Sequence, residues 1–219
     1  MSCCSCEGYQ SQFGDKHAAK DLRRYHRKGP DKTTRLLLDQ LTAAGVRGAS
    51  LLDIGAGIGV VHHELLETGA DSVVHVDATA ANIDAAGAEA ARRGHTPRVR
   101  FLQGDFLALA PGLTTADVVT LDRVICCYPE MEQLVSQSAA RVGRLWGAVY
   151  PRERLLFKAF VRIGNGIRRM LGNDFRTFIH STDAIDSTLR RAGFELRSMK
   201  QTYGWRAAVY SRSVRPRTV

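Results

Sequence analysis

A glycine-rich turn directly behind an apolar run is the first place in this sequence where chemistry is expected. The stretch LLDIGAGIG (51–59) places Asp53 ahead of Gly55, Gly57 and Gly59. Three glycines let the backbone turn tightly and let a ligand approach without meeting a Cβ atom. The spacing G-x-G-x-G differs from the G-x-G-x-x-G of dinucleotide-binding loops. Because a carboxylate at this point would repel a pyrophosphate, the turn favours a ligand with a cationic ammonium or sulfonium group.

Three further acids follow other apolar runs. Asp77 ends VVHVD, twenty residues beyond Gly57, Asp105 follows VRFLQG, and Asp122 ends DVVTLD. An acid after the second strand of an α/β sheet can accept hydrogen bonds from the hydroxyls of a ribose. Because the carboxyl ends of parallel strands meet at one edge of the sheet, we expect these acids and Asp53 to converge on one cleft.

Short β-rich runs alternate with helical stretches along the chain. The helical stretches 33–45, 81–94 and 182–193 each stop at a glycine, as helices commonly do. The alternation predicts an α/β fold with a Rossmann-like, seven-stranded, mostly parallel sheet and helices on both faces. The link 200–206 is too short for a crossover helix, so the last strand should return antiparallel. The expected strands are 50–54, 73–77, 99–103, 117–121, 145–150, 194–200 and 206–212.

The motifs DIGAGIG, VDAT and GDF, at the ends of successive strands, make the chain resemble the class I S-adenosylmethionine-dependent methyltransferases. The resemblance is nearest to the small-molecule branch that includes the magnesium-protoporphyrin and the ubiquinone- and menaquinone-type methyltransferases. It implies S-adenosyl-L-methionine as cofactor and S-adenosyl-L-homocysteine as product. The methionine end would lie at the glycine turn, the ribose at Asp77, and the adenine at Asp105 and Phe106. The cofactor-binding residues that the resemblance implies are Asp53, Gly55, Ala56, Gly57, Gly59, Asp77, Ala78, Asp105, Phe106 and Asp122.

The stretch LDRVICCYPE (121–130) places two adjacent cysteines and a tyrosine where this fold separates cofactor from acceptor. The related branch has a histidine before the Tyr-Pro pair, and Cys127 occupies its place here, so the tetrapyrrole acceptor is not assigned. Methyl transfer from a sulfonium is a direct displacement that needs no enzyme thiol. We therefore expect Cys127 to line the acceptor pocket and Tyr128 to orient the acceptor.

Other roles for the cysteines stay open. A thiolate at Cys126 or Cys127 would be stabilised by the helix that follows. Cys3, Cys4 or Cys6 folding over Cys127 would form a soft-metalloid site of the kind that arsenite methyltransferases use. Cys3-x-x-Cys6 also has the spacing of zinc ligands, but no second such pair follows, so no metal site is expected.

The segment 151–180, between the fifth strand and the helix at 182, is longer than a tight connection needs, and we expect it to cap the acceptor pocket. Its part 152–171 carries apolar residues at helical spacing with six Arg or Lys interleaved. Gly164 and Gly166 are expected to weaken or break this helix midway. A lid with an apolar underside and a helix lying on a membrane surface are both consistent with the pattern.

Two polar residues follow in the same segment. Imidazole titrates near neutral pH, so His180 is the expected general base. Arg176 could hold a carboxylate of the acceptor. A histidine ahead of a helix is also a common cap residue, and His62 and His63, after the glycine turn, are expected to be structural.

Residues 1–30 resemble the leading helix that closes over the cofactor in these enzymes. Tyr9, Phe13, Tyr25 and Lys28 could then touch a ligand. The alternative is a helix that only packs on the edge of the sheet.

Composition and charge limit the classes of protein and of binding partner. Hydrophobic residues make up 44% and charged residues 24%, and no linker divides the chain, so 1–219 should form a single domain. The N-terminus lacks the apolar stretch of a secretory signal, so we expect a cytoplasmic protein. The net charge of +9 could serve nucleic acid, but no Asn/Asp-Pro-Pro-Tyr-type sequence follows the fourth strand. We expect a small organic acceptor, amphipathic ones included. An RNA methyltransferase and a non-catalytic cofactor-binding protein are the alternatives, and the oligomeric state is left open.

Overall fold

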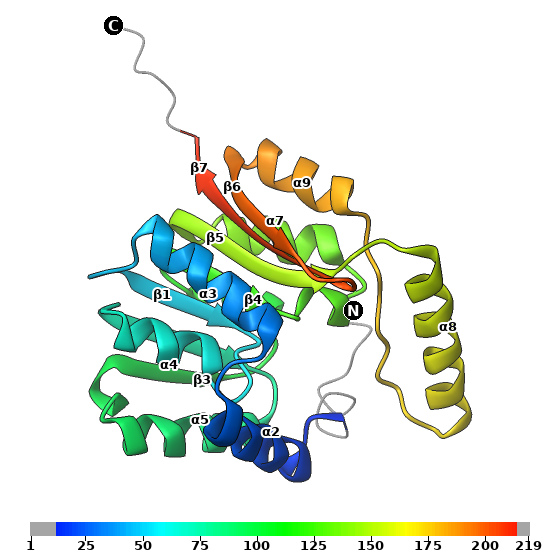
Figure 1. Ribbon diagram of the computed structural model, residues 1–219, viewed down its shortest axis with the longest axis horizontal. Coiled ribbons are helices and arrows are strands. Elements are labelled where there is room, and N and C mark those ends of the chain that lie inside the picture. Colours follow the sequence, from blue (N-terminus) through cyan, green and yellow to red (C-terminus); the bar gives the residue numbers. More distant parts are fainter. Residues whose placement is uncertain (1–11, 214–219) are drawn as a thin grey trace, which may run out of the picture.

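The computed structural model describes residues 12–213 and joins seven strands of this part of the chain into one sheet (Figure 1). The strands are β1 (Ser50–Ile54), β2 (Ser72–Asp77), β3 (Val99–Gln103), β4 (Ala116–Asp122), β5 (Val142–Pro151), β6 (Phe194–Gln201) and β7 (Trp205–Arg212). Their spatial order is β3-β2-β1-β4-β5-β7-β6. β1 to β5 pair in parallel, and β7 is antiparallel to both β5 and β6. The expected mostly parallel sheet with an antiparallel last strand is confirmed.

Helices cover both faces of this sheet, as expected. They are α2 (Asp15–Lys28), α3 (Lys32–Ala44), α4 (Val60–Glu67), α5 (Ala80–Arg93), α6 (Phe106–Leu109), α7 (Met131–Ala139), α8 (Leu155–Met170) and α9 (Thr182–Arg191), with short 3₁₀ turns at Thr96–Arg98, Ala110–Gly112 and Ile125–Cys127. Residues of α3 and α4 pack on one face, and residues of α6, α7 and α9 pack on the other. α5 lies beside α4 (Figure 1).

Successive residues of a strand point to opposite faces, so neighbours in the sequence belong to different cores. Leu51 and Val118 pack with Leu41 of α3, whereas Leu52 and Val119 belong to the core under α7 and α9. Burial on both faces explains why the central strands read as continuous apolar runs. It also holds the carboxyl ends of these strands rigidly in place.

The strand order reverses between β1 and β4. The chain proceeds from β1 outward through β2 to β3, and from β4 outward through β5 in the other direction. Ligands in such sheets bind beyond the carboxyl ends at this switch point. Asp53 lies near the end of β1, and Asp77 and Asp122 end β2 and β4.

Gly164 and Gly166 do not break α8, which runs without interruption through both residues. The Asn165 side chain between them makes two tertiary hydrogen bonds to one residue. Its Nδ2 donates to Thr177 O at 2.7 Å, and its Oδ1 accepts from Thr177 N at 3.0 Å. These bonds offset the cost of about 1 kcal/mol that each glycine carries inside a helix.

Other differences from the expected elements lie at their ends. α7 begins at Met131 with Glu130 as its N-cap, so Pro129 lies just ahead of the helix. β5 begins at Val142, earlier than expected, because it pairs with β4 from Ala116 onward. Long-range pairing, which a local pattern does not contain, decides these ends.

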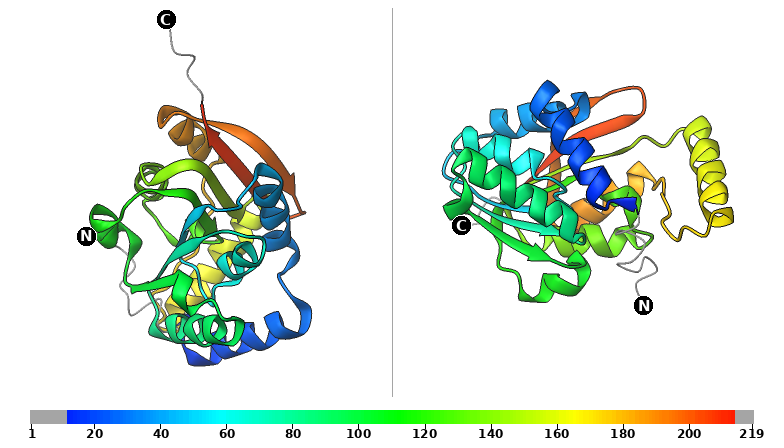
Figure 2. Two further views of the ribbon diagram at one scale, coloured as in Figure 1. Left: turned by 90° about the vertical axis from the view of Figure 1, so that its left-hand side faces the viewer. Right: turned by 90° about the horizontal axis from the view of Figure 1, so that it is seen from below.

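α8 stands apart from the helices that cover the sheet (Figures 1 and 2). It is joined to α9 by an extended segment that returns toward the body of the molecule (Figure 1). Over residues 12–213, no helix has both the length and the apolar content needed to cross a bilayer.

Candidate active site

A cavity of about 610 Å³ opens beyond the carboxyl ends of β1, β2 and β4. This volume lies within the range of pockets for small molecules. Carboxylates outnumber guanidinium groups around it, and the charged residues that line it are Asp21, Asp31, Asp53, Asp77, Asp122, Arg24 and Arg123. The excess of acids favours a ligand that carries positive charge.

The glycine turn forms one wall of the cavity. Gly55, Gly57 and Gly59 have φ values of 58°, 57° and 84°, which L-residues with a Cβ rarely adopt. A Cβ at Gly57 would meet no atom within 4 Å, whereas one at Gly59 would lie 2.6 Å from His62 Cε1. Gly57 therefore leaves open space on the cavity side, and Gly59, which does not line the cavity, permits close packing from below.

Asp77 ties the end of β2 to the glycine turn. Its Oδ2 accepts from Gly57 N at 2.8 Å, and its Oδ1 accepts from Thr79 N, Thr79 Oγ1 and Asn82 Nδ2 at 2.9, 2.9 and 3.1 Å. Ala78 and Thr79 also line the cavity. A carboxylate oxygen has more than one acceptor site, so Oδ2 can still accept from a ligand hydroxyl. The side chain is held at the place where a ribose is expected.

Asp53 is turned into the protein beneath the turn. Strand register pairs it with Thr120 of β4 and His75 of β2. Thr120 Oγ1 donates to Asp53 Oδ1 at 2.6 Å, and His62 Nδ1 donates to Oδ2 at 2.9 Å. Burial raises the pKa of Asp53 to about 6, against the opposing hydrogen bond from Thr120. The carboxylate supports the turn and adds negative potential at the cavity floor.

Four buried histidines, His62, His63, His75 and His95, fill the space under the glycine turn. The rings of His62 and His63 lie 4.3 Å apart, and those of His62 and His75 lie 5.1 Å apart. Burial lowers the pKa of His62 to about 3 and also lowers the pKa of His63 and His75. The rings are therefore neutral at pH 7, in agreement with the structural role expected for His62 and His63.

An ion network borders the other side of the cavity. Arg123, with an unusual φ of 64°, contacts Asp31 Oδ2 at 2.5 Å and Asp122 Oδ1 at 3.3 Å. Thr34 Oγ1 donates to Asp122 Oδ2 at 2.6 Å. Burial would raise the pKa of Asp31, but Arg123 and the Thr34 hydrogen bond lower it to about 2. Arg24 Nη2 lies 3.8 Å from Asp31 Oδ2, so the network presents guanidinium groups as well as acids.

Asp105 does not line the cavity, although Gly104 and Phe106 on either side of it do. Its Oδ1 caps α6 by accepting from Leu107 N at 3.3 Å, and it accepts from Tyr128 Oη at 2.6 Å. This bond joins the end of β3 to the segment after β4. Phe106 is fully buried and lines the cavity, where an adenine ring is expected.

The residues around the cavity suit S-adenosylmethionine. Asp53 and Asp122, which line the cavity, would complement its sulfonium and ammonium groups, and Arg24 would complement its carboxylate. Asp77 keeps acceptor capacity for ribose hydroxyls, and the open side of Gly57 lets the ligand approach the backbone. The cavity wall thus carries acids and guanidinium groups that would face the cationic and anionic ends of such a molecule.

Known proteins resemble this chain in sequence and in fold. Residues 51–144, from β1 to the start of β5, match the family model of the methyltransferase domain. This match identifies a methyltransferase domain in that part of the chain. A search of curated proteins found no match.

Solved structures have the same fold. Magnesium protoporphyrin IX methyltransferase from Synechocystis PCC 6803, solved with bound S-adenosylhomocysteine, is 22% identical over 94% of each chain, with a TM-score of 0.69. A TehB-like methyltransferase from Corynebacterium glutamicum is 18% identical over 91% of this chain and 98% of its own, with a TM-score of 0.63. An O-methyltransferase family protein from Burkholderia thailandensis is 17% identical over 94% of this chain and 63% of its own, with a TM-score of 0.70.

Two adjacent cysteine side chains, Cys126 and Cys127, form part of the cavity wall. Cys126 Sγ donates to Arg123 O at 3.3 Å, and Cys127 Sγ lies 3.7 Å from the same oxygen. The hydrogen bond from Cys127 lowers the pKa of Cys126, although burial opposes it. The residues considered for a soft-metalloid site, Cys3, Cys4 and Cys6, lie outside the described part. Within 12–213, no three His, Cys, Asp or Glu side chains are arranged to hold a metal ion.

His180, the expected general base, is not among the residues that line the cavity. Its Nε2 donates to the backbone carbonyl of Tyr128 at 2.8 Å, so this nitrogen is not available to accept a proton. Burial lowers the pKa of His180, and its ring stacks on Phe178 with centroids 5.8 Å apart. Tyr128 itself lines the cavity. The geometry makes His180 a support for Tyr128, and its role as base stays a prediction.

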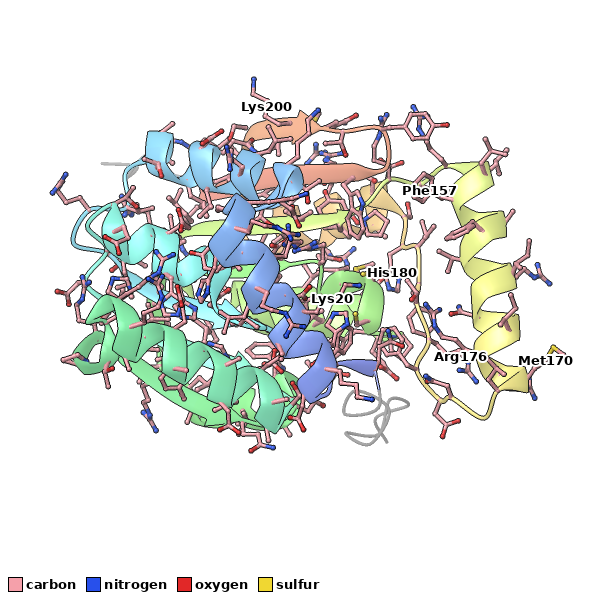
Figure 3. All side chains as sticks on the ribbon, turned by 60° about the horizontal axis from the view of Figure 1, so that its bottom comes forward. Lys20, Phe157, Met170, Arg176, His180 and Lys200 are labelled. Atoms are coloured by element: carbon pink, nitrogen blue, oxygen red, sulfur yellow. The ribbon has the colours of Figure 1, made fainter. Side chains whose placement is uncertain are left out.

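The cap reaches the cavity through its returning segment. Phe175 and Thr177 line the cavity, whereas Arg176 does not. Arg176 Nη1 donates to Asn173 O and to Phe175 O, within its own loop. None of the described side chains of α8 lines the cavity or is buried, so the apolar underside expected for a lid is not present in this arrangement. Figure 3 shows Arg176 and His180 on the segment between α8 and the body.

The N-terminal helix contributes residues that the sequence pattern did not single out. His17, Asp21 and Arg24 of α2 line the cavity together with Phe13. His17 Nε2 lies 3.2 Å from Asp21 Oδ2, an i,i+4 pair whose spacing was visible in the sequence. Trp205, at the start of β7, also lines the cavity.

Of the other residues expected to touch a ligand, Tyr25 is buried and donates to Glu64 Oε1 at 2.5 Å. Neither Tyr25 nor the exposed Lys28 lines the cavity, and Tyr9 lies outside the described residues. α2 thus both packs on α5 and closes one side of the cavity. That this helix closes over a cofactor stays a prediction.

Proposed function

We propose that this methyltransferase transfers a methyl group to a small organic acceptor with a largely apolar body. The observation that carries the proposal is the division of the cavity wall. Asp53, Asp77 and Asp122 line the part at the strand ends, while Phe13, Phe175, Trp205 and Cys127 line other parts. The likeness to the magnesium protoporphyrin IX methyltransferase structure is in keeping with an apolar acceptor.

S-Adenosylmethionine, when bound, supplies an electrophilic methyl group on a sulfonium. The cofactor-binding roles that we propose for Asp53, the glycine turn, Asp77, Phe106 and Asp122 follow their places in the cavity wall. Asp105 would support the cofactor site indirectly, because its carboxylate already accepts hydrogen bonds from Tyr128 Oη and from Leu107 N at the start of α6. The protein's contribution is to exclude water and to align donor and acceptor.

Removal of a proton from the acceptor requires a base within reach of the cavity. The sequence points to His180, but the geometry favours His17, which lines the cavity and is oriented by Asp21. We assign the base to His17 and give His180 the task of holding the Tyr128 backbone. Tyr128 and Cys127 remain our candidates for acceptor contact, and Arg176 would need to leave its own carbonyl partners to reach an acceptor.

A test starts from binding of S-adenosylhomocysteine by calorimetry and then measures transfer of labelled methyl from S-adenosylmethionine into a small-molecule extract. We expect both to occur, and binding without transfer to any fraction would favour a non-catalytic cofactor-binding protein. His17→Gln should lower kcat at least tenfold, whereas His180→Gln should change KM more than kcat. The reverse pattern would return the role of base to His180.

RNA is the second candidate acceptor, and the net charge of +9 favours it. The acid-rich cavity opposes it, because phosphates would approach five aspartates. Methyl transfer to tRNA or rRNA, with binding that weakens steeply as salt rises, would replace a small acceptor by RNA.

We also propose a cytoplasmic location. The sequence holds five cysteines, an odd number that does not suit a disulfide framework and favours a reducing compartment. Fractionation of cells with an antibody against the protein tests this, and recovery only from a secreted fraction would contradict it.

A further inference from the structure

α8 carries a stripe of large apolar side chains that nothing in the described structure covers. Leu156, Phe160, Ile163, Ile167 and Met170 repeat at intervals of three and four residues, which places them on one side of a helix. With Leu155 and Leu171, they are 53–87% exposed. We call Leu156, Phe160, Ile163, Ile167 and Met170 the apolar face. A contiguous apolar surface of this kind marks an interaction site.

The contacts of α8 hold this face away from the cavity. Asn165 is bonded to both backbone groups of Thr177, and Arg168 Cζ lies 5.7 Å from the centroid of the Phe175 ring. Phe157 packs directly against Gly204 at the β6–β7 turn. Figure 3 shows Phe157 on the side toward this turn and Met170 pointing away from the body. Turning the apolar face inward would break all of these contacts.

The same segment is strongly basic. Residues 152–171 contain six Arg or Lys and one acid, Glu153, which is paired with Lys158 at 2.6 Å. Arg162 and Arg169 are exposed and make no ion pair with a carboxylate of residues 12–213. Tyr203, also exposed, extends the surface next to Phe157, and the Arg154 guanidinium stacks on it at 4.4 Å. An aromatic ring beside an arginine suits the boundary between an apolar layer and water.

We infer that α8 docks the protein onto an anionic lipid surface, with the apolar face in the acyl boundary. A helix with an apolar face, a basic polar face and little net hydrophobicity lies in the plane of a membrane surface. Basic side chains near such a surface are attracted by anionic headgroups. A second copy of the chain would bring the same excess of positive charge to the contact, whereas anionic lipid neutralises it.

Docking of α8 would also bring the acceptor pocket close to the lipid surface. This part of the inference rests on the proposed function. Asn165 and Arg168 join α8 to Thr177 and Phe175, which line the cavity. A helix on the lipid surface therefore lies one segment away from the acceptor pocket. The acceptor class that this arrangement fits is an amphipathic molecule that resides in the bilayer.

Co-sedimentation of the full chain with vesicles tests the docking without any cofactor. We expect binding to phosphatidylcholine vesicles that contain phosphatidylserine, and weaker binding to phosphatidylcholine alone. The double variant F160S/I163S should lose about tenfold or more in partitioning on both, because apolar burial is lost. R162Q/R169Q should lose roughly fivefold for each charge on the anionic vesicles only, and added salt should remove this difference.

The matched control is L196S/M199S, which removes two exposed apolar side chains from β6. It should bind vesicles like the wild type, and all variants should retain their affinity for S-adenosylhomocysteine. Failure of the wild type to bind anionic vesicles overturns the inference, as does wild-type binding by F160S/I163S. If the wild type forms a dimer without lipid and F160S/I163S is a monomer, the apolar face binds a second copy of the chain instead of lipid. Loss of methyl transfer to every small acceptor, with vesicle binding intact, would overturn the proposed function and leave the docking in place.

Discussion

The glycine-turn side of the cavity and the α8 side of the molecule are built in opposite ways. At the turn, Asp53 and Asp77 are nearly inaccessible to solvent, and each accepts hydrogen bonds from at least two neighbouring groups. At α8, large apolar side chains are exposed, and only a few polar contacts join the helix to the body. Buried hydrogen bonds thus hold the glycine-turn side of the cavity in a fixed arrangement, whereas α8 presents an uncovered apolar surface.

The difference teaches that the two ligands are recognised by different means. At the site proposed for it, S-adenosylmethionine would meet groups whose positions are held by the sheet, so this site would exist before the cofactor binds. The acceptor side depends on a segment attached mainly through Asn165 and Phe157. Substitutions should therefore affect stability and cofactor binding at the turn, and membrane contact at α8.

The largest effect is expected at Gly59. Gly59→Ala should lower the free energy of unfolding by roughly 2–5 kcal/mol, because it adds backbone strain at positive φ to a clash with His62. Urea unfolding at pH 7.5 measures this. Gly94→Ala is the control, since Gly94 has a φ of 70° with no atom within 4 Å of a Cβ, so it tests the strain alone. Equal losses in the two variants would contradict the packing described for the turn.

Acid should destabilise the turn next most strongly. His62, His63 and His75 stay neutral when folded but take up protons below pH about 6.5 when unfolded, so stability falls as the pH drops below that value. Asp53 acts in the opposite direction between pH 6 and its unfolded pKa, because the folded state binds its proton first. Three histidine protons bound by the unfolded state, less the one Asp53 proton bound by the folded state, leave a net of two protons. The free energy of unfolding should therefore change by at most about 2.7 kcal/mol per pH unit.

Urea midpoints measured from pH 7.5 down to 5 check this expectation. His75→Leu removes a ring whose two nitrogens have no hydrogen-bond partner within residues 12–213. It should decrease the slope by up to about 1.4 kcal/mol per pH unit. A stability that does not change between pH 6.5 and 5 would show that these rings are not kept neutral by the fold.

A smaller effect is expected where the two regions meet. Tyr128→Phe removes the hydrogen bond to Asp105 and should cost about 1.5 kcal/mol of stability, the lower end for a bond to a charged group. It should also weaken S-adenosylhomocysteine binding, because Asp105 precedes Phe106 at the cavity. Tyr203→Phe, on the exposed turn, serves as the control for calorimetry and unfolding. Unchanged cofactor affinity in Tyr128→Phe would mean that the two sides are independent.

The smallest effect is expected on α8. Ile163→Ser should change the free energy of unfolding by no more than about 0.5 kcal/mol, because its side chain is exposed. Leu121→Ala, in the core of β4, should cost about 2–5 kcal/mol by comparison. Similar losses in both variants, measured by urea unfolding, would show that the apolar face is covered in solution.

Much of the cofactor side could be predicted from the sequence because its signals are local. A run of apolar residues ending in an acid and a glycine turn specifies a strand, its end and the conformations that follow. Asp53, Asp77 and Asp122 converge because parallel strands share one edge. The partners of these acids were not visible, since His62 and Thr120 reach Asp53 only through packing and strand register.

The acceptor side shows the limit of such local signals. The amphipathic pattern of 152–171 is correct, but a period of 3.6 residues does not say which way an apolar face points. The tertiary bonds of Asn165 decide that, and they also carry the helix through its two glycines. Likewise, His180 is hydrogen-bonded to the backbone carbonyl of Tyr128, whereas α2 brings His17 and Asp21 to the cavity. The sequence alone determined the elements and the cofactor class, because strands, turns and charges are encoded over short stretches. Only the tertiary structure decided which side chains meet at the cavity and which face of α8 is left open, because those depend on partners far apart in the chain.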